Sequence, residues 1–175
     1  VAKAHCAIIN SGMQVMLKDL CTPSGTRCRG QRVDLHSLDD GDVVEIGDFR
    51  IQVAIQSSSL HNEQTASGIR LDEPASSRAV GIRLQPAGNE PPVDLQSPVY
   101  LVGRRDECDL ALADSQISLA HAIFFWFSGR AVVADLGSRT GTWINGEQQS
   151  LAYLKVGDVL RIGSYEATIG GGESD

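Results

Sequence analysis

The chain has few cysteines and no long hydrophobic run. Its 175 residues include four cysteines, Cys6, Cys21, Cys28 and Cys108, and no two of them form a C-x-x-C pair. We therefore expect free thiols rather than a zinc or redox motif, and neither a metal nor a cofactor. No apolar run approaches the roughly 20 residues that a membrane-spanning helix needs, so we expect no membrane insertion.

Positive charge is also scarce. The chain carries 15 Lys and Arg against 22 Asp and Glu, a formal net charge of −7. This balance argues against nucleic acid as a partner, because binding to a phosphate backbone needs a positive field. We expect no signal peptide in the N-terminal residues Val1–His5, and we expect a cytoplasmic location.

A helical repeat of apolar residues is absent over any useful length. Cys6–Ile9 and Val15–Leu17 flank the turn signal Asn10-Ser11-Gly12 and predict a hairpin. Apolar residues then alternate along Phe49–Ile55, which predicts a strand with one buried face. Many short strands separated by Gly-rich turns indicate an all-β fold of the sandwich type.

The chain contains an internal repeat. The loop Asp135–Gly146 has the same pattern as Asp19–Gly30, and further residues match at the same spacing of 116 positions, including His5 with His121 and Asp42 with Asp158. A constant spacing across turn-forming residues predicts two tandem copies of one β-sandwich.

The two copies differ in extent. We assign residues 1–55 to the C-terminal part of a first copy, 56–77 to a linker and 78–171 to a complete second copy. The first copy begins almost at its histidine and is therefore expected to be incomplete at its N-terminus. Either the natural chain extends upstream of Val1, with room for further domains, or another segment completes the first sheet.

Three motifs follow one another in the second copy: Gly103-Arg104, Ser118-x-x-His121 and Asp135-Leu136-x-Ser138-x-x-Gly141-Thr142-x-x-Asn145-Gly146. Together they resemble the forkhead-associated (FHA) domain family. The resemblance implies an eleven-stranded β-sandwich whose apical loops bind threonine-phosphorylated proteins or peptides.

Five residues are the candidate phosphopeptide ligands: Arg104, Ser118, Ser138, Arg139 and Thr140. A guanidinium forms charge-assisted bonds to phosphate, so Arg104 is the expected principal ligand and Arg139 can add charge. Hydroxyl groups donate to the remaining phosphate oxygens. Two converging arginines would offset the acidic average of the chain locally.

Four residues are expected to be structural: His121, Asp135, Gly141 and Asn145. The resemblance implies that His121 braces Ser118. Asp135 is expected to brace its loop, and Asn145 to form a hairpin turn. The aromatic run Phe124–Phe127 is expected to pack in the core.

The sequence departs from the family pattern in both copies. Thr140 stands where the family usually has an Asn that holds the peptide backbone, and Leu119 stands where a basic or polar residue often follows the serine. In the first copy the residues matching Ser118, Arg139, Thr140 and Asn145 are Ala2, Pro23, Ser24 and Arg29. We therefore expect the first copy to be degenerate and to have lost its phosphate site.

Two functions remain open. The first is a phosphothreonine-dependent binding module in signalling, and the alternative is a phospho-independent protein-interaction scaffold. Burial of the apex of the second copy against the first would favour the scaffold. An enzyme is not expected, because no G-x-S-x-G motif, Walker loop or paired carboxylates are present.

Overall fold

A computed structural model describes residues 4–56 and 82–171. The predicted linker (beyond Gln56), Ala2 and Val80 lie outside the described residues. The described part of the chain contains eighteen strands, and helices are absent from it, which confirms the all-β prediction. Accordingly, the described ranges hold no helix of the length and hydrophobicity that a membrane crossing requires.

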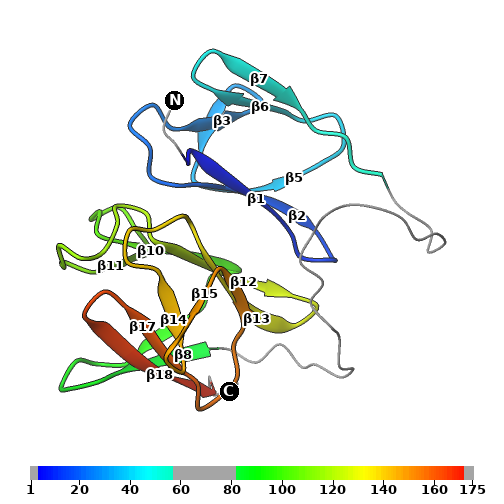
Figure 1. Cartoon of the computed structure of the whole chain (residues 1–175). Coiled ribbons are helices and arrows are strands. Elements are labelled where there is room, and N and C mark those ends of the chain that lie inside the picture. Colours follow the sequence, from blue (N-terminus) through cyan, green and yellow to red (C-terminus); the bar gives the residue numbers. More distant parts are fainter. Residues whose placement is uncertain (1–3, 57–81, 172–175) are drawn as a thin grey trace.

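The C-terminal half is a two-sheet sandwich of eleven strands (Figure 1). One sheet has the order β11-β10-β12-β13-β16 and the other the order β15-β14-β17-β18-β8-β9. The strands are β8 (Ile82–Pro86), β9 (Val93–Leu95), β10 (Val99–Gly103), β11 (Leu110–Ala111), β12 (Ala122–Phe127), β13 (Arg130–Asp135), β14 (Thr142–Ile144), β15 (Glu147–Gln149), β16 (Leu151–Tyr153), β17 (Val159–Ile162) and β18 (Tyr165–Gly171). The expected eleven-stranded sandwich is thus confirmed.

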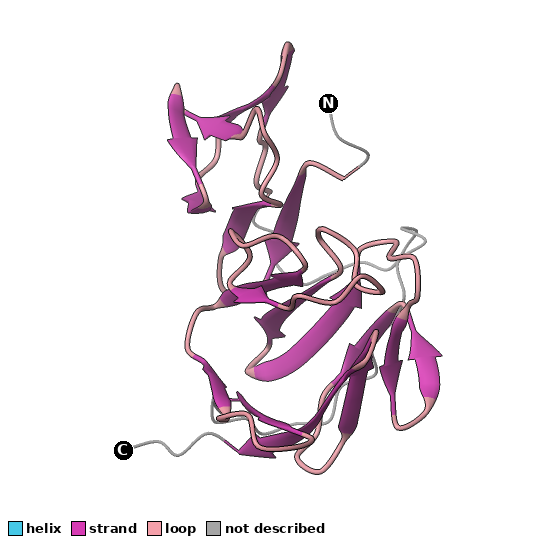
Figure 2. Cartoon of the chain, turned by 90° about the vertical axis from the view of Figure 1, so that its left-hand side faces the viewer, coloured by secondary structure: helices cyan, strands magenta, loops and turns pink. Residues whose placement is uncertain are grey.

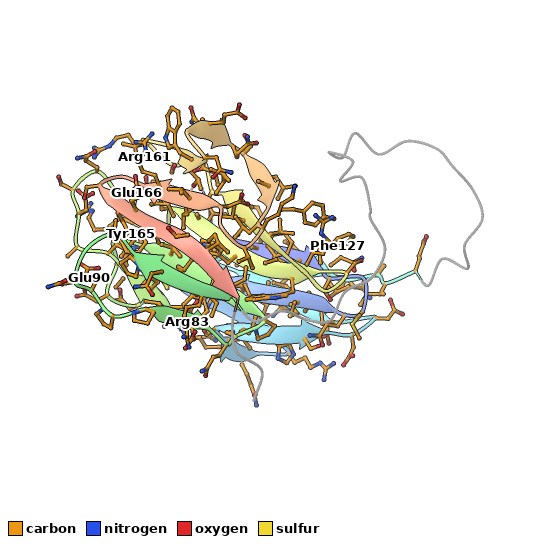
Figure 3. The ribbon with its side chains drawn as sticks, turned by 90° about the horizontal axis from the view of Figure 1, so that it is seen from below. Arg83, Glu90, Phe127, Arg161, Tyr165 and Glu166 are labelled. Carbon is orange, nitrogen blue, oxygen red and sulfur yellow. The ribbon has the colours of Figure 1, made fainter. Side chains whose placement is uncertain are left out.

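Apolar side chains of both sheets fill the space between them. Phe124 of β12, Leu84 of β8 and Leu160 of β17 are all almost fully buried in one cluster. Strand pairing also joins segments that are distant in the sequence. β18 pairs with β8 and brings the two ends of this half together. In the view from below, β8 and β18 lie side by side and carry Arg83 and Tyr165 (Figure 3).

The N-terminal half has seven strands in two smaller sheets, ordered β1-β2-β5 and β4-β3-β6-β7. They are β1 (Cys6–Asn10), β2 (Val15–Asp19), β3 (Thr26–Cys28), β4 (Gln31–Val33), β5 (Leu35–Leu38), β6 (Val43–Ile46) and β7 (Phe49–Gln52). Strands β3, β4 and β6 match β14, β15 and β17 at the 116-residue spacing. The pairing order also matches that of β12–β18, which supports the interpretation of two copies.

The expectation for Phe49–Ile55 is wrong in one respect. The strand β7 ends at Gln52, and its predicted buried face is exposed: Phe49 is 65% and Ile51 42% accessible. The reason is its place in the sheet. β7 is an edge strand next to β6, whereas its counterpart β18 lies between β17 and β8, and there Ala167 and Ile169 are buried.

The two halves pack face to face (Figures 1 and 2). Ile9, Met16 and Leu20 form one apolar cluster with Val99, Leu101 and Ile123 on the outer face of the five-stranded sheet and with Cys108 of the loop between β10 and β11. A second cluster around Leu17 and Val44 joins the two small sheets. The strands therefore stack in four layers, with the complete sandwich contributing two of them.

Polar contacts join the same two surfaces. The Lys18 ammonium, only 2% exposed, lies 2.9 Å from Asp34 of its own half and 3.0 Å from Asp109 of the other half. The Arg105 guanidinium donates to the backbone carbonyls of Leu20 and Cys21. The buried Lys18 ammonium thus has one carboxylate partner in each half, as the burial of a charge requires.

Candidate functional site

Three loops at one end of the complete sandwich bring the candidate ligands together. They follow β10, precede β12 and connect β13 to β14. The first loop starts at Gly103, where an added Cβ would lie 2.3 Å from the Leu119 carbonyl oxygen. The Gly103-Arg104 motif therefore has a steric cause, because only glycine lets these two loops approach so closely.

The Arg104 side chain is exposed, and its backbone N–H and its Nε are both held by the second loop. Its backbone N–H donates to the Ser118 carbonyl at 3.0 Å. Its Nε donates to the Ile117 carbonyl at 3.1 Å. This contact orients the guanidinium and leaves its two terminal amino groups to bind two oxygens of one anion.

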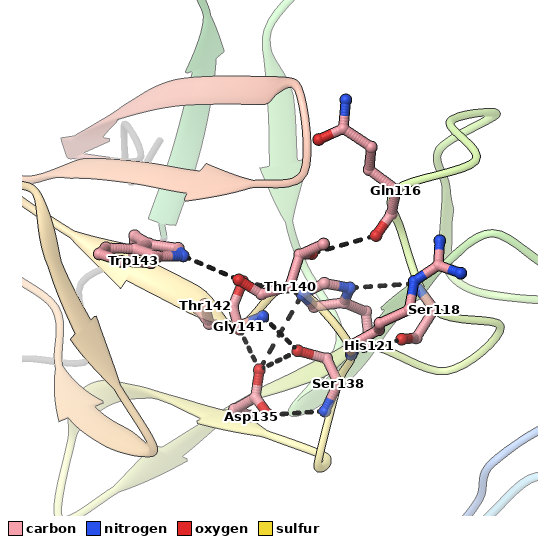
Figure 4. A network of polar contacts seen from close by, with 10 residues as sticks. Gln116, Ser118, His121, Asp135, Ser138, Thr140, Gly141, Thr142 and Trp143 are labelled. Carbon is pink, nitrogen blue, oxygen red and sulfur yellow. Dashed lines mark hydrogen bonds and ion pairs between the residues drawn. The ribbon is translucent and has the colours of Figure 1, made fainter.

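Several hydrogen bonds join the second and third loops, and Figure 4 shows the one from Thr140 to Gln116. The Arg139 N–H donates to Ser118 Oγ at 3.0 Å. The Arg139 guanidinium donates to the Ser115 carbonyl at 2.5 Å, and Thr140 Oγ1 to the Gln116 carbonyl at 3.0 Å. Since Ser118 Oγ accepts the Arg139 N–H, its own hydroxyl hydrogen points elsewhere and can donate to a ligand oxygen.

His121 is fully buried and holds the second loop against the third (Figure 4). Its Nδ1 accepts the Ser118 N–H at 3.1 Å, so Nε2 carries the proton and donates to the Gly141 carbonyl at 3.1 Å. Burial holds the pKa of His121 below its usual range, although Gly141 and Asp135 act in the opposite direction. The ring is neutral at physiological pH and acts as a structural brace, as expected.

Asp135 organises the third loop from its base. Its carboxylate accepts the Ser138 N–H at 2.8 Å, the Ser138 hydroxyl at 2.6 Å and the Thr142 hydroxyl at 2.8 Å. Burial alone would raise the pKa of Asp135, but these hydrogen bonds outweigh it and lower the pKa. The Ser138 hydroxyl also accepts the Gly141 N–H at 3.0 Å. Ser138 thus lies in the interior of the loop, while Arg139 and Thr140 lie at its outer side.

The other predicted structural residues shape the turns behind the site. Gly141 has φ of 77°, a conformation that disfavours side chains. Asn145 has φ of 52°, and its side chain bonds both Asp158 and the Val159 N–H. Trp143 donates its indole N–H to the Thr140 carbonyl, and Arg161 lies 4.6 Å above its ring. Arg161 is labelled in Figure 3.

One residue that holds the second loop in place was not predicted from the sequence. Asp114 accepts the N–H of Gln116 and both the N–H and hydroxyl of Ser164. These bonds lower the pKa of Asp114 and tie the second loop to the β17–β18 turn. An isolated Asp in a polar loop carries no sequence signal for such a role.

The apex is accessible to solvent. Arg104 and Arg139 are exposed, and Ser118 and Thr140 are half-buried. The first half contacts the neighbouring Arg105 instead, through the carbonyls of Leu20 and Cys21. The burial of the apex that would have favoured the scaffold is therefore not observed.

The matching loop of the first half keeps the bracing and changes the outer residues. The Asp19 carboxylate accepts the hydroxyls of Thr22 and Thr26, as Asp135 does for Ser138 and Thr142. His5 Nε2 lies 3.0 Å from the Gly25 carbonyl oxygen. Pro23 and Ser24 occupy the outer positions. The loop thus retains its shape without the arginine of the other half.

An eleven-stranded sandwich with arginine, serine and threonine side chains at one apex is the architecture of a phosphopeptide-binding β-sandwich class. A family model for the FHA domain matches residues 1–47 and 100–163. This covers more than half of the chain, and the chain belongs to the FHA domain family.

Relatives and solved structures are similar to parts of the chain. An oxoglutarate dehydrogenase inhibitor of Corynebacterium diphtheriae is 31% identical over 67% of this chain and 81% of its own length. The glycogen accumulation regulator GarA of Mycolicibacterium smegmatis is 37% identical over 41% of this chain and 45% of its own. A structure of Mycobacterium tuberculosis EmbR in complex with a low-affinity phosphopeptide is 25% identical, with a TM-score of 0.51, and covers 54% of this chain and 26% of that one.

The extent of these matches varies. The chain spans half of the inhibitor of Corynebacterium efficiens, at 37% identity, and less than half of GarA from Mycolicibacterium smegmatis. The activity of the whole protein is therefore a matter for proposal.

Proposed function

We propose that the chain is a phosphothreonine-dependent binding module whose ligand is a threonine-phosphorylated protein or peptide. The observation that carries this proposal is the exposed Arg104 guanidinium, fixed through Nε to the carbonyl of Ile117, the residue that precedes Ser118. The geometry leaves two amino groups and one hydroxyl to donate to phosphate oxygens. Arg139 adds a second positive charge from the facing loop, which suits the dianionic phosphate.

The relatives support this proposal. The EmbR structure contains a phosphopeptide, and the names of the other relatives describe an inhibitor and a regulator. These names support a role in regulation through binding rather than catalysis, so we assign the chain no enzymatic activity. A cytoplasmic location belongs to the same proposal and is supported by four free thiols. Cell fractionation with a fluorescent fusion would test it, and a membrane-associated or secreted pool would contradict it.

Fluorescence anisotropy with a degenerate phosphothreonine peptide library tests the binding function. Phosphorylated peptides should bind, whereas phosphoserine and unphosphorylated versions should not. Loss of a charge-assisted phosphate contact costs on the order of 2 kcal/mol, so Arg104→Ala should weaken binding about 30-fold or more.

Arg50 provides a matched control for the loss of an exposed arginine. Its side chain is 78% exposed and pairs with Glu45 in the first half, away from the apex. Arg50→Ala should therefore leave phosphopeptide affinity unchanged. Equal binding of phosphorylated and unphosphorylated peptides would reject this function and favour the scaffold.

A further inference from the structure

Three potential metal ligands converge between the two sheets of the first half. Cys28 ends β3 in one sheet, His36 lies on β5 in the other, and Asp42 lies in the turn before β6. Their ligand atoms all lie within 4.8 Å of one another. Cys28 and Asp42 are buried at 2% and 5% exposure. No zinc-motif spacing marks these three residues in the sequence.

The repeat shows that two of these residues are specific to the first half. At the 116-residue spacing, Cys28 matches Ile144 and His36 matches Ala152, and both of these pack in the apolar core of the second half. Asp42 matches Asp158, and each aspartate accepts a backbone N–H of its own turn. The fold thus requires the aspartate, whereas it accommodates plain aliphatic residues in place of the thiol and the imidazole.

The imidazole of His36 is an independent indication of a ligand. Its Nε2 is buried and has no hydrogen-bond partner among the described residues. A buried polar atom without a partner is unfavourable unless something binds to it. An imidazole nitrogen without a partner that lies beside a thiol and a carboxylate is suited to coordinating a cation.

The carboxylate retains a free coordination site. Asp42 Oδ1 accepts the Arg29 Nε–H at 2.5 Å, and Oδ2 accepts the Asp39 N–H at 2.9 Å. Each carboxylate oxygen has two lone pairs, so one remains on each oxygen. Arg29 orients the carboxylate and places one positive charge nearby, which moderates the affinity for a cation.

We propose that Cys28, His36 and Asp42 form a zinc site between the two sheets of the first half. One thiolate, one imidazole and one carboxylate are a ligand set that suits Zn²⁺, and three protein ligands leave a fourth tetrahedral position for water. The site is distinct from the apex and does not depend on the phosphopeptide function. It gives a binding capacity of its own to the half whose loop has Pro23 and Ser24 in place of Arg139 and Thr140.

Zinc binding at this site displaces a proton. Cysteine binds a metal as the thiolate, so Zn²⁺ replaces the thiol proton of Cys28 as the Zn–S bond forms, and the proton passes to solvent.

The experiment uses the full chain after chelator treatment and desalting, with Zn²⁺ and Co²⁺ as probes. Competition with a chromophoric chelator should give one Zn²⁺ per chain. Co²⁺ should produce the near-ultraviolet band of thiolate-to-cobalt charge transfer, which reports a Co–S bond directly. Zn²⁺ should also raise the melting temperature of the wild-type chain.

The control variant uses the residues of the second half. The double substitution Cys28→Ile with His36→Ala introduces the residue types that the second half has at the matched positions, Ile144 and Ala152. The fold should therefore be retained, which circular dichroism can check. This variant should bind Zn²⁺ at least about tenfold more weakly and lack the cobalt band, while its phosphopeptide binding stays unchanged. Cys21→Ala, which removes a thiol outside the site, should bind both metals as the wild type does.

Two results would overturn the proposal. One is a wild-type chain that shows no charge-transfer band with Co²⁺ and no shift in melting temperature with Zn²⁺. The other is an unchanged zinc affinity in the folded double variant, which would place any bound ion elsewhere.

Discussion

At the scale of single residues, Thr140 limits the proposed peptide site. Its hydroxyl donates to the Gln116 carbonyl at 3.0 Å and is used within the protein. An asparagine there, which is usual in the family, carries an amide with both a donor and an acceptor for a peptide backbone. Thr140→Asn should tighten phosphopeptide binding by about 1 kcal/mol, or about fivefold, as measured by anisotropy.

The variant Thr140→Val provides the matched control for this prediction. It keeps the shape of the side chain and removes only the hydroxyl, so it should loosen the loop without adding a peptide contact. We expect affinity equal to or below that of the wild type. If Thr140→Asn binds no more tightly than the wild-type chain, position 140 does not contact the peptide backbone.

The motifs made the candidate residues predictable but not their bonding. Arg104 and Ser118 are recognisable because the family pattern marks their positions, and Arg139 because it adds a positive charge to the loop that the third motif defines; all three lie in the loops at one apex. That Ser118 Oγ accepts the Arg139 N–H depends on loop packing, which sequence spacing does not encode. Cys28 and His36 could have been noticed, since they interrupt an otherwise apolar set of matched positions.

At the scale of the loops, His121 makes stability depend on pH. Its folded-state pKa lies below the ordinary value of 6.5, chiefly because of burial. The native state therefore favours the neutral ring, and its contribution is complete above pH 6.5. As the pH falls below this value, the unfolded chain takes up the proton first and stability is lost. Thermal unfolding at about pH 7.5 and about pH 5.5 should show this loss.

His121→Gln separates the histidine from the other titrating groups. The variant loses the Nδ1 and Nε2 hydrogen bonds and should be less stable at about pH 7.5. The difference from the wild type should shrink as the pH falls, because glutamine does not titrate. Asp135, 3.9 Å from Nε2, stays ionised over this range since its pKa is lowered. A constant difference across the range would contradict the assignment.

Two strands that were not predicted from the sequence, β9 and β15, are each only three residues long. The segment from Pro86 to Pro98 reads as an irregular excursion, yet β9 (Val93–Leu95) pairs with β8 inside it. Glu147–Gln149 of β15 is polar and pairs across the Asn145-Gly146 turn, so its register comes from the turn. Hydrophobic periodicity needs longer segments than three residues to identify a strand.

At the scale of the whole molecule, the stacking of the two halves had only a weak sequence signal. Val99–Val102 and Ala122–Phe127 are apolar without alternation, which is typical of strands buried on both faces. In β12, Phe124 faces the sandwich core, while Ile123 faces the first half. The sequence therefore indicated that a second face is covered, but it did not identify the partner that covers it.

The pair of Lys18 and Asp109 should make a measurable contribution to this packing. Lys18 is 2% exposed and lies 3.0 Å from Asp109, which is 26% exposed and also accepts the Leu101 N–H. Lys18→Met keeps the volume and leaves Asp109 without its cation. Because one partner is buried and the other is partly exposed, removing one of them should cost more than at an exposed salt bridge and less than at a fully buried one. We expect a loss of about 2 kcal/mol in the free energy of unfolding.

Urea unfolding followed by tryptophan fluorescence measures this loss. Adding Asp109→Asn to Lys18→Met should recover part of the stability, because asparagine removes the unpaired charge and still accepts the Leu101 N–H. Arg50→Ala, which breaks the exposed pair with Glu45, should cost less than about 1 kcal/mol. A Lys18→Met chain as stable as the wild type would mean that the apolar cluster alone holds the halves together. Recovery in the double variant would instead show that the pairing of charges across the boundary helps to fix their packing.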